Sequence, residues 1–102
     1  MPIYMTMDVP ASRDDLEAVS NAMNVRDDVP DGLIAHVAMD LPDGAGIRVV
    51  DLWESAEHFA EFAETRLAPT MARVLAERGV ELDGPPPEPT IIEAYDLVRG
   101  RA

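Results

Sequence analysis

The segment GLIAHVAMDLPDGAGIRVVDLWESAEHFAEFAETRL, residues 32–67, decides how this chain folds. Two apolar runs within it, Leu33 to Asp40 and Ile47 to Trp53, flank a loop with one proline and two glycines. This pattern predicts two strands joined as a hairpin. Ser55, a good helix N-cap, then precedes apolar residues at helical spacing. We therefore predict strand, turn, strand and helix, in that order.

The flanking sequence adds one strand and one helix before this segment and one strand after it. Residues 2–8 alternate between apolar and polar side chains, and Ser12 precedes an apolar stripe of helical period. Pro69 is expected to kink or restart the second helix. A proline-rich tract at 83–89 is expected to connect that helix to a last strand at 90–98. The order β-α-β-β-α-β predicts an α+β, ferredoxin-like fold with a four-stranded antiparallel sheet and both helices on one face.

Composition bounds the class of protein. The 102 residues suit a single domain, residues 1–102, and the hydrophobic fraction of 47% favours a folded chain despite a net charge of −12. The eight basic residues, all arginine, are scattered singly among 20 acidic ones, which argues against binding to nucleic acid or to an anionic membrane surface. The start of the chain lacks a signal-peptide pattern, and no apolar run approaches the ~20 residues of a membrane span. We expect a cytoplasmic protein.

The later strands are apolar on both faces. Val49 and Trp53 alternate with Val50 and Leu52, so whichever set packs on the helices leaves the other set uncovered. A second copy of the sheet is the simplest cover. The sequence therefore predicts a homodimer.

The hairpin also suggests a candidate base. Its loop length favours a register that places His36 opposite Asp51, on the same side of the sheet. The same register places Ile34 opposite Trp53 and Ala38 opposite Val49. A buried carboxylate beside an imidazole would orient the ring and make it a general base. The alternative is a hydrogen-bonded polar pair at the dimer interface with no catalytic duty.

Four further residues are candidates for substrate binding: Tyr4, Trp53, Glu93 and Tyr95. The three aromatic side chains are predicted to line one cavity suited to a hydrophobic, flat aromatic or polyketide-like ligand. Core packing is the competing explanation for Trp53. Glu93 is a second acid or base, a partner for an arginine, or a solvated residue at the sheet edge.

No metal site is predicted. His36, His58 and Asp51 would make a two-histidine, one-carboxylate set, but no ligand spacing in the sequence supports it. There is no cysteine, and the nucleophile-elbow, P-loop and dinucleotide-binding motifs are all missing from the sequence. Hydrolase-elbow and nucleotide-binding functions are therefore rejected. His58, in the first turn of the predicted second helix, is expected to be exposed.

The run VVDLWESAEHF (49–59), with GLIAHV (32–37) before it and RLAP (66–69) after it, resembles the dimeric α/β-barrel superfamily. More narrowly, the chain is similar to small proteins grouped with the antibiotic biosynthesis monooxygenases. The resemblance implies a ferredoxin-like monomer that pairs face to face, with a ligand pocket between sheet and helices or within the barrel. Its members include cofactor-free quinone-forming oxygenases, haem-degrading enzymes, polyketide cyclases and isomerases. The haem-degrading branch usually carries an Asn on an early strand, where this chain offers Tyr4 and Thr6.

Two functional hypotheses follow. The first is a homodimeric enzyme, without cofactor, that oxygenates, cyclises or isomerises a hydrophobic aromatic or polyketide-type metabolite. His36 would abstract a proton and Asp51 would orient His36. The second is a non-catalytic module that binds a small ligand or serves as a structural dimer.

Overall fold

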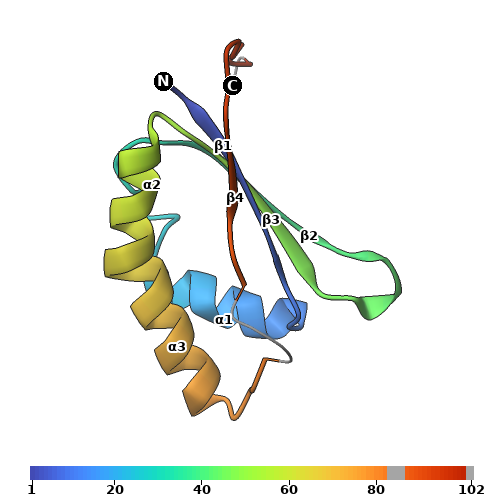
Figure 1. Cartoon of the computed structure of the whole chain (residues 1–102). Helices are drawn as coiled ribbons and strands as arrows, with labels where there is room; N and C mark the ends of the chain where they lie inside the picture. The colour runs from blue at the N-terminus through green and yellow to red at the C-terminus, as the bar shows by residue number, and fades with distance from the viewer. Residues whose placement is uncertain (83–86, 101–102) are drawn as a thin grey trace.

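The computed structural model describes residues 1–82 and 87–100. They form a four-stranded antiparallel sheet of order β2-β3-β1-β4 with the helices on one face (Figure 1). This confirms the predicted α+β, ferredoxin-like architecture. The tract predicted as a connector at 83–89 lies largely outside the described residues. The elements are β1 (Ile3–Val9), α1 (Arg13–Met23), β2 (Leu33–Asp40), the 3₁₀ turn η1 (Pro42–Gly44), β3 (Ile47–Trp53), α2 (Ala56–Phe62), the π-helical turn η2 (Ala63–Leu67), α3 (Ala68–Glu77) and β4 (Thr90–Glu93).

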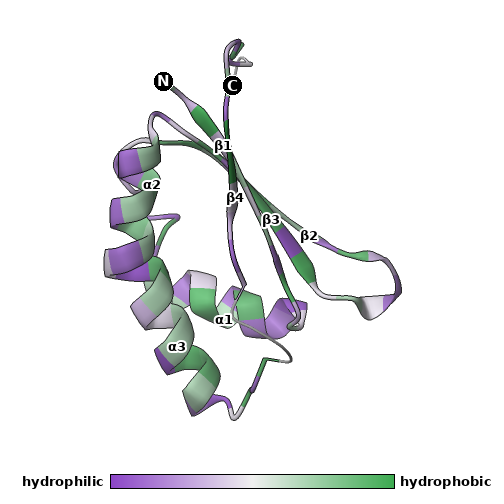
Figure 2. Ribbon diagram, in the orientation of Figure 1, coloured by the Kyte–Doolittle hydropathy of each residue, from purple (hydrophilic) through white to green (hydrophobic). Residues whose placement is uncertain are grey.

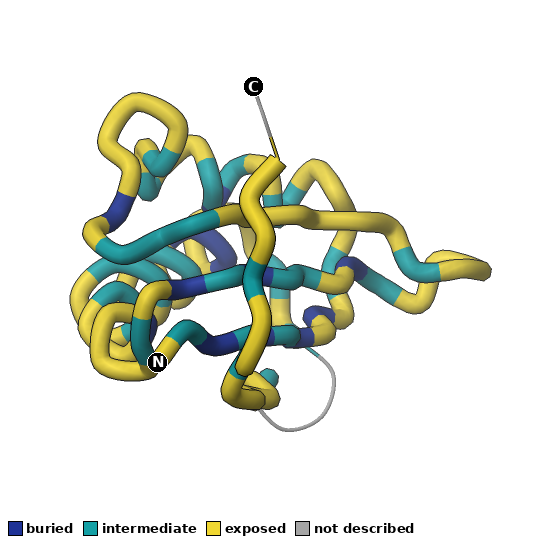
Figure 3. Tube along the Cα trace, turned by 90° about the horizontal axis from the view of Figure 1, so that it is seen from above, coloured by how far each residue is buried: buried dark blue, intermediate teal, exposed yellow. Residues whose placement is uncertain are grey.

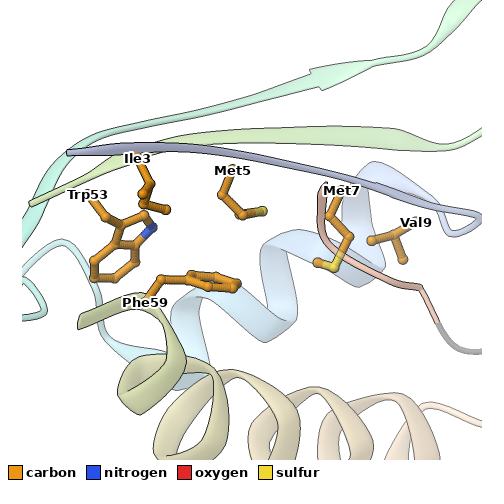
Figure 4. Close-up of a cluster of buried hydrophobic side chains, with 6 residues drawn as sticks. All are labelled: Ile3, Met5, Met7, Val9, Trp53 and Phe59. Atoms are coloured by element: carbon orange, nitrogen blue, oxygen red, sulfur yellow. The ribbon is translucent and has the colours of Figure 1, made fainter. Parts of the chain in front are cut away.

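Strand β1 sets the two faces of the sheet. Its odd-numbered residues are buried under the helices and pack with Trp53 and Phe59 in the main core cluster (Figure 4). Its even-numbered residues lie on the opposite face, which we call the open face. The strand register adds four apolar neighbours to Tyr4 and Thr6 on the open face: Val37, Val50, Leu52 and Ile92.

Both predicted N-caps are present. The Ser12 hydroxyl accepts a hydrogen bond from the backbone N–H of Asp15 at 3.2 Å, and α1 follows. The Ser55 hydroxyl accepts one from the backbone N–H of His58 at 3.2 Å, and α2 follows. Each cap satisfies a donor at a helix start that has no partner within the helix.

The second helical region is interrupted, as Pro69 predicts. Pro69 has no N–H to donate, and five residues of π-helix, Ala63–Leu67, separate α2 from α3 just before it. Along α2 the hydrophilic residues lie mainly on the side away from the sheet (Figure 2). Helix α3 ends at Glu77, and Gly79 follows its C-cap Arg78 with a φ of +70°, which allows the Val80 N–H to bond the Leu75 carbonyl at 2.9 Å.

The last strand is shorter than predicted. We expected residues 90–98 to be extended, but β4 ends at Glu93, and it is exposed along its length (Figure 3). The reason lies in its neighbour β1: Glu93 pairs with Ile3 at the beginning of β1, and one further bond joins the Ala94 N–H to the Pro2 carbonyl. Beyond that point β1 offers no backbone to pair with.

The hairpin register is largely as predicted. His36 pairs with Asp51 and Ala38 with Val49, but a β-bulge makes Leu33, not Ile34, the partner of Trp53. The extra residue shifts Leu33 onto the helix face, where it packs against the core. The prediction for Ile34 was therefore wrong.

Candidate functional site

A cavity of about 580 Å³ lies between the sheet and the helices. The strands β1, β2 and β3 supply one wall, including His36 and Asp51. Helix α1 supplies Leu16 and Met23, and the loop after it supplies Val25. A volume of this size suits a small organic molecule.

His36 and Asp51 contact each other inside this cavity. Nδ1 of His36 lies 2.6 Å from Oδ1 of Asp51. The histidine side chain is 40% exposed, and that of Asp51 is 5% exposed. An ionised carboxylate only accepts hydrogen bonds, so Nδ1 must carry the proton in this contact. Nε2 is then the ring's basic nitrogen, and the arrangement fits a general base.

Trp53 contacts the other oxygen of the same carboxylate. Its indole Nε1 donates to Oδ2 of Asp51 at 3.2 Å. The tryptophan has 0% exposure, with its ring packed edge-on against Phe59 at a centroid distance of 5.8 Å and tilted against Phe62 at 5.2 Å. It borders the cavity, but it offers no free ring face to a ligand in this conformation. The sequence analysis missed this hydrogen bond, although the spacing Asp-x-Trp on one strand face is a signal for it.

One end of the cavity carries an ion pair. Nε of Arg13, at the beginning of α1, donates to Oδ2 of Asp40 at 3.1 Å, at the end of β2. The hydrogen bond from Arg13 holds the pKa of Asp40 below its ordinary value, and Asp40 raises the pKa of Arg13. Both residues line the cavity. The pair therefore joins the two elements that border this end.

A loop over the cavity is fastened by Arg66. Nη1 of Arg66 donates to the carbonyl oxygens of Met23 and Asp28 at 3.0 and 2.9 Å. Val25 and Pro30, from the same loop, line the cavity. Arg66 belongs to the π-helical turn, so the irregular turn places a charged anchor under the loop.

Methionine is the commonest residue type in the cavity lining, which the sequence analysis did not anticipate. The methionines that line it come from two strands and two helices: Met5, Met7, Met23, Met39 and Met71. Thioether side chains are flexible and polarisable, so such a wall adapts to ligands of different shape. The signal was present as alternate methionines along β1.

Three predicted binding residues lie away from His36. Tyr4 is on the open face, where a second hollow of about 470 Å³ also includes Thr6 and Arg48. Glu93 is exposed at the end of β4, and Tyr95 follows the strand with 99% exposure. Within one chain, these residues do not share the cavity of His36 with Trp53, and their part in ligand binding stays a prediction.

His58 lies outside the cavity, at the start of α2, where its Nδ1 is 2.7 Å from the Ser55 hydroxyl. Among residues 1–82 and 87–100, no three His, Cys, Asp or Glu side chains gather as a metal-ion site would require. None of the helices in this part of the chain is long and apolar enough to cross a membrane.

Solved structures resemble the chain over nearly its whole length. The structure of Rv0793 from Mycobacterium tuberculosis superposes with a TM-score of 0.66 and 20% identity, over 97% of this chain and 100% of that one. A candidate antibiotic biosynthesis monooxygenase from Deinococcus radiodurans superposes with a TM-score of 0.64 and 13% identity, over 100% of both chains. SnoaB, a cofactor-independent oxygenase from Streptomyces nogalater, superposes with a TM-score of 0.59 and 14% identity, over 95% of this chain and 94% of that one. The chain shares their fold.

No protein-family model matches the sequence, and no curated protein sequence matches it significantly. The likeness to the antibiotic biosynthesis monooxygenase-like proteins is therefore one of architecture. Within that architecture the cavity of His36 occupies one of the two places that the resemblance implies, between the sheet and its helices. Fold alone does not carry an activity, so the function must be argued from the site.

Proposed function

We propose that this protein is an enzyme that removes a proton from a hydrophobic, aromatic or polyketide-type ligand, with His36 as the general base. The observation that carries the proposal is the 2.6 Å contact between His36 and the buried carboxylate of Asp51 in the wall of a cavity. Asp51 fixes the tautomer that leaves Nε2 basic, and it stabilises the imidazolium that forms. The apolar lining suits the ligand class.

The carbanion formed by this step has two outcomes that need no co-reactant. It can attack a carbonyl of the same molecule, which closes a ring, or it can regain the proton at another carbon, which isomerises the ligand. With dioxygen as co-reactant, the carbanion forms a carbon–oxygen bond. The resulting peroxide anion then takes the proton back from His36 and becomes a hydroperoxide. Loss of water then leaves a carbonyl group. The shared fold with SnoaB, described as a cofactor-independent oxygenase, supports the outcome with dioxygen.

We further propose that the open face pairs with the open face of a second copy. Val37 and Ile92 are exposed there, beside the half-buried Val50. The charged residues Arg48 and Asp8 pair with each other, with Nε and Oδ1 2.7 Å apart. The face is thus apolar and locally neutral in a chain of net charge −12, which allows two copies to meet without strong repulsion. In the described residues no helix covers it (Figure 1).

Proton abstraction is tested by hydrogen–deuterium exchange at carbon. The probes are flat ketones with an acidic C–H, such as anthrone, followed by NMR in heavy water with a chelator present. Oxygen uptake by the same mixtures separates the oxygenase outcome from the others. We expect wild-type protein to accelerate exchange and His36→Gln to lose about 10²–10⁴-fold of the acceleration. His58→Gln, the same change at the histidine outside the cavity, is the matched control and should exchange the probe at the wild-type rate.

The outcomes separate the two hypotheses for the site. Exchange by His36→Gln at the wild-type rate would exclude His36 as the base. Saturable binding of the probe with no exchange would instead favour a module that holds its ligand without turnover.

A further inference from the structure

We propose that Trp53 is a positioning residue, whose indole N–H fixes the Asp51 carboxylate that in turn holds His36. This inference deepens the proposed function and rests on it for its consequence for turnover. The link is a chain of two hydrogen bonds, from Trp53 Nε1 to Asp51 Oδ2 at 3.2 Å and between Asp51 Oδ1 and His36 Nδ1 at 2.6 Å. It gives the tryptophan a role other than stacking on a ligand.

The indole is held firmly enough for such a role. Trp53 has 0% exposure, and Figure 4 shows its ring among core side chains, between the sheet and Phe59. The edge-on contact with Phe59 and the tilted contact with Phe62 limit rotation of the ring. Its N–H therefore stays directed at the carboxylate.

The carboxylate needs this donor. Asp51 is the one charged residue in the described part of the chain that is classed as buried, and a buried carboxylate is costly unless its oxygens accept hydrogen bonds. His36 hydrogen-bonds to Oδ1, and Trp53 donates to Oδ2. Without the indole N–H, Oδ2 faces apolar surroundings with no donor, and the carboxyl group is free to rotate away from His36.

The strand explains why the two residues meet. Asp51 and Trp53 are two positions apart on β3, so both project onto the helix face. His36 is the cross-strand partner of Asp51 on β2. All three side chains are consequently held by one hairpin, and the tryptophan is the member that is anchored in the core.

The inference predicts which tautomer the neutral ring adopts. A carboxylate at Nδ1 favours the Nδ1–H form, whereas a free imidazole side chain in water favours Nε2–H. The tautomer is read from the ¹⁵N shifts of the ring with no ligand present. His58, whose Nδ1 contacts Ser55, gives an internal reference in the same spectrum.

The decisive variants remove the donor and keep an aromatic side chain. Trp53→Phe puts a smaller ring in place of the indole, and benzothienylalanine substitutes sulfur for the N–H at almost constant volume. We expect both to lose the Nδ1–H preference of His36 and to lower kcat for carbon exchange about 10- to 100-fold with KM nearly unchanged. Val74→Ala removes buried volume from the other core cluster, which does not include the indole, and should keep the wild-type tautomer.

Retention of the Nδ1–H form in the benzothienylalanine protein would overturn the inference. So would loss of that form in Val74→Ala to the same extent as in Trp53→Phe. If wild-type protein exchanges no probe but the tautomer shifts as expected, the positioning role stands and the proposed enzyme activity fails.

Discussion

The imidazole of His36 is half-exposed, while the Asp51 carboxylate that it contacts is almost fully covered. The charge that orients the ring is thus shielded from solvent, but the ring itself reaches the cavity. A buried partner is screened less by water and salt than an exposed one, so the orientation should persist at high ionic strength. Burial of one partner this deep distinguishes the pair from the other ion pairs of the described residues.

Replacing Asp51 separates its charge from its shape. In Asp51→Asn the amide oxygen can accept from Trp53, and the amide N–H₂ then donates to Nδ1 of His36, which moves the ring proton to Nε2. We expect carbon exchange to fall about 10²–10⁴-fold and the free energy of unfolding to change by less than about 1.5 kcal/mol. Asp51→Ala leaves two donors unpaired and should cost about 2–3 kcal/mol in urea unfolding. Equal stability losses in the two variants would contradict this account.

The proposed pairing of two open faces can be tested with two variants that each add one glutamate. Val37→Glu adds a carboxylate to that face on the edge strand β2, at a side chain that is exposed in the single chain. Val98→Glu adds the same charge at an exposed position after the last strand. Sedimentation should show the first variant as a monomer and the second as a dimer, like wild type. A dimeric Val37→Glu protein would place the interface elsewhere.

Arg66 should control how often the loop over the cavity opens. Arg66→Met keeps the apolar stem and removes the donors to the Met23 and Asp28 carbonyls. We expect a local loss of about 1–2 kcal/mol, seen as roughly 5- to 30-fold faster exchange of the Asp28 and Leu33 amides, which are hydrogen-bonded within the loop. Arg73→Met breaks only an exposed i,i+4 pair and should leave both amides unchanged. Equal acceleration by both variants would remove the anchoring role.

Two glycines of the hairpin loop should differ in how much stability is lost when each is replaced by alanine. Gly44 (φ +68°) has open space where a Cβ would lie. Gly44→Ala should therefore lose only the free energy of holding an alanine in the left-handed conformation, about 1 kcal/mol. At Gly46 (φ +129°) a Cβ would lie 2.3 Å from the Val9 carbonyl oxygen. Backbone must then move, and we expect a loss of roughly 3 kcal/mol in urea unfolding. Similar losses in the two variants would show that the close approach to Val9 is not a constraint.

Acid should weaken a contact between the two helical segments. Arg78 of the α3 terminus donates from Nε to Asp15 of α1 at 2.8 Å, which holds the pKa of Asp15 below its ordinary value of 3.8. A lowered folded-state pKa gives stability that is present above the unfolded value and is lost as the pH falls through the folded one. Asp15→Asn should therefore be less stable than wild type at about pH 6, and the difference should vanish towards about pH 2. A difference that does not depend on pH would refute the linkage.

Local patterns predicted the parts of the fold that depend on local chemistry. The caps at Ser12 and Ser55, the alternation along β1 and the break at Pro69 each follow from a few neighbouring residues. The contact between His36 and Asp51 was predictable because a short loop fixes the hairpin register.

Features that depend on distant pairings were not predictable in the same way. The bulge at Ile34 and the early end of β4 depend on how neighbouring strands fit, and nothing in their own residues marks them. Tyr4 was expected beside Trp53, but the register between β1 and β3 pairs it with Leu52 and directs it to the open face. A one-residue difference in such a register exchanges the two faces of a strand.

The residues proposed to move a proton and the walls that would select a ligand come from different parts of the chain. His36, Asp51 and Trp53 belong to one hairpin, whereas much of the lining comes from α1 and the loop that follows it. Substitutions in the helices can therefore reshape the cavity while the hairpin keeps its hydrogen bonds. During evolution, such a division would let ligand preference drift between relatives without the reactive group being rebuilt each time.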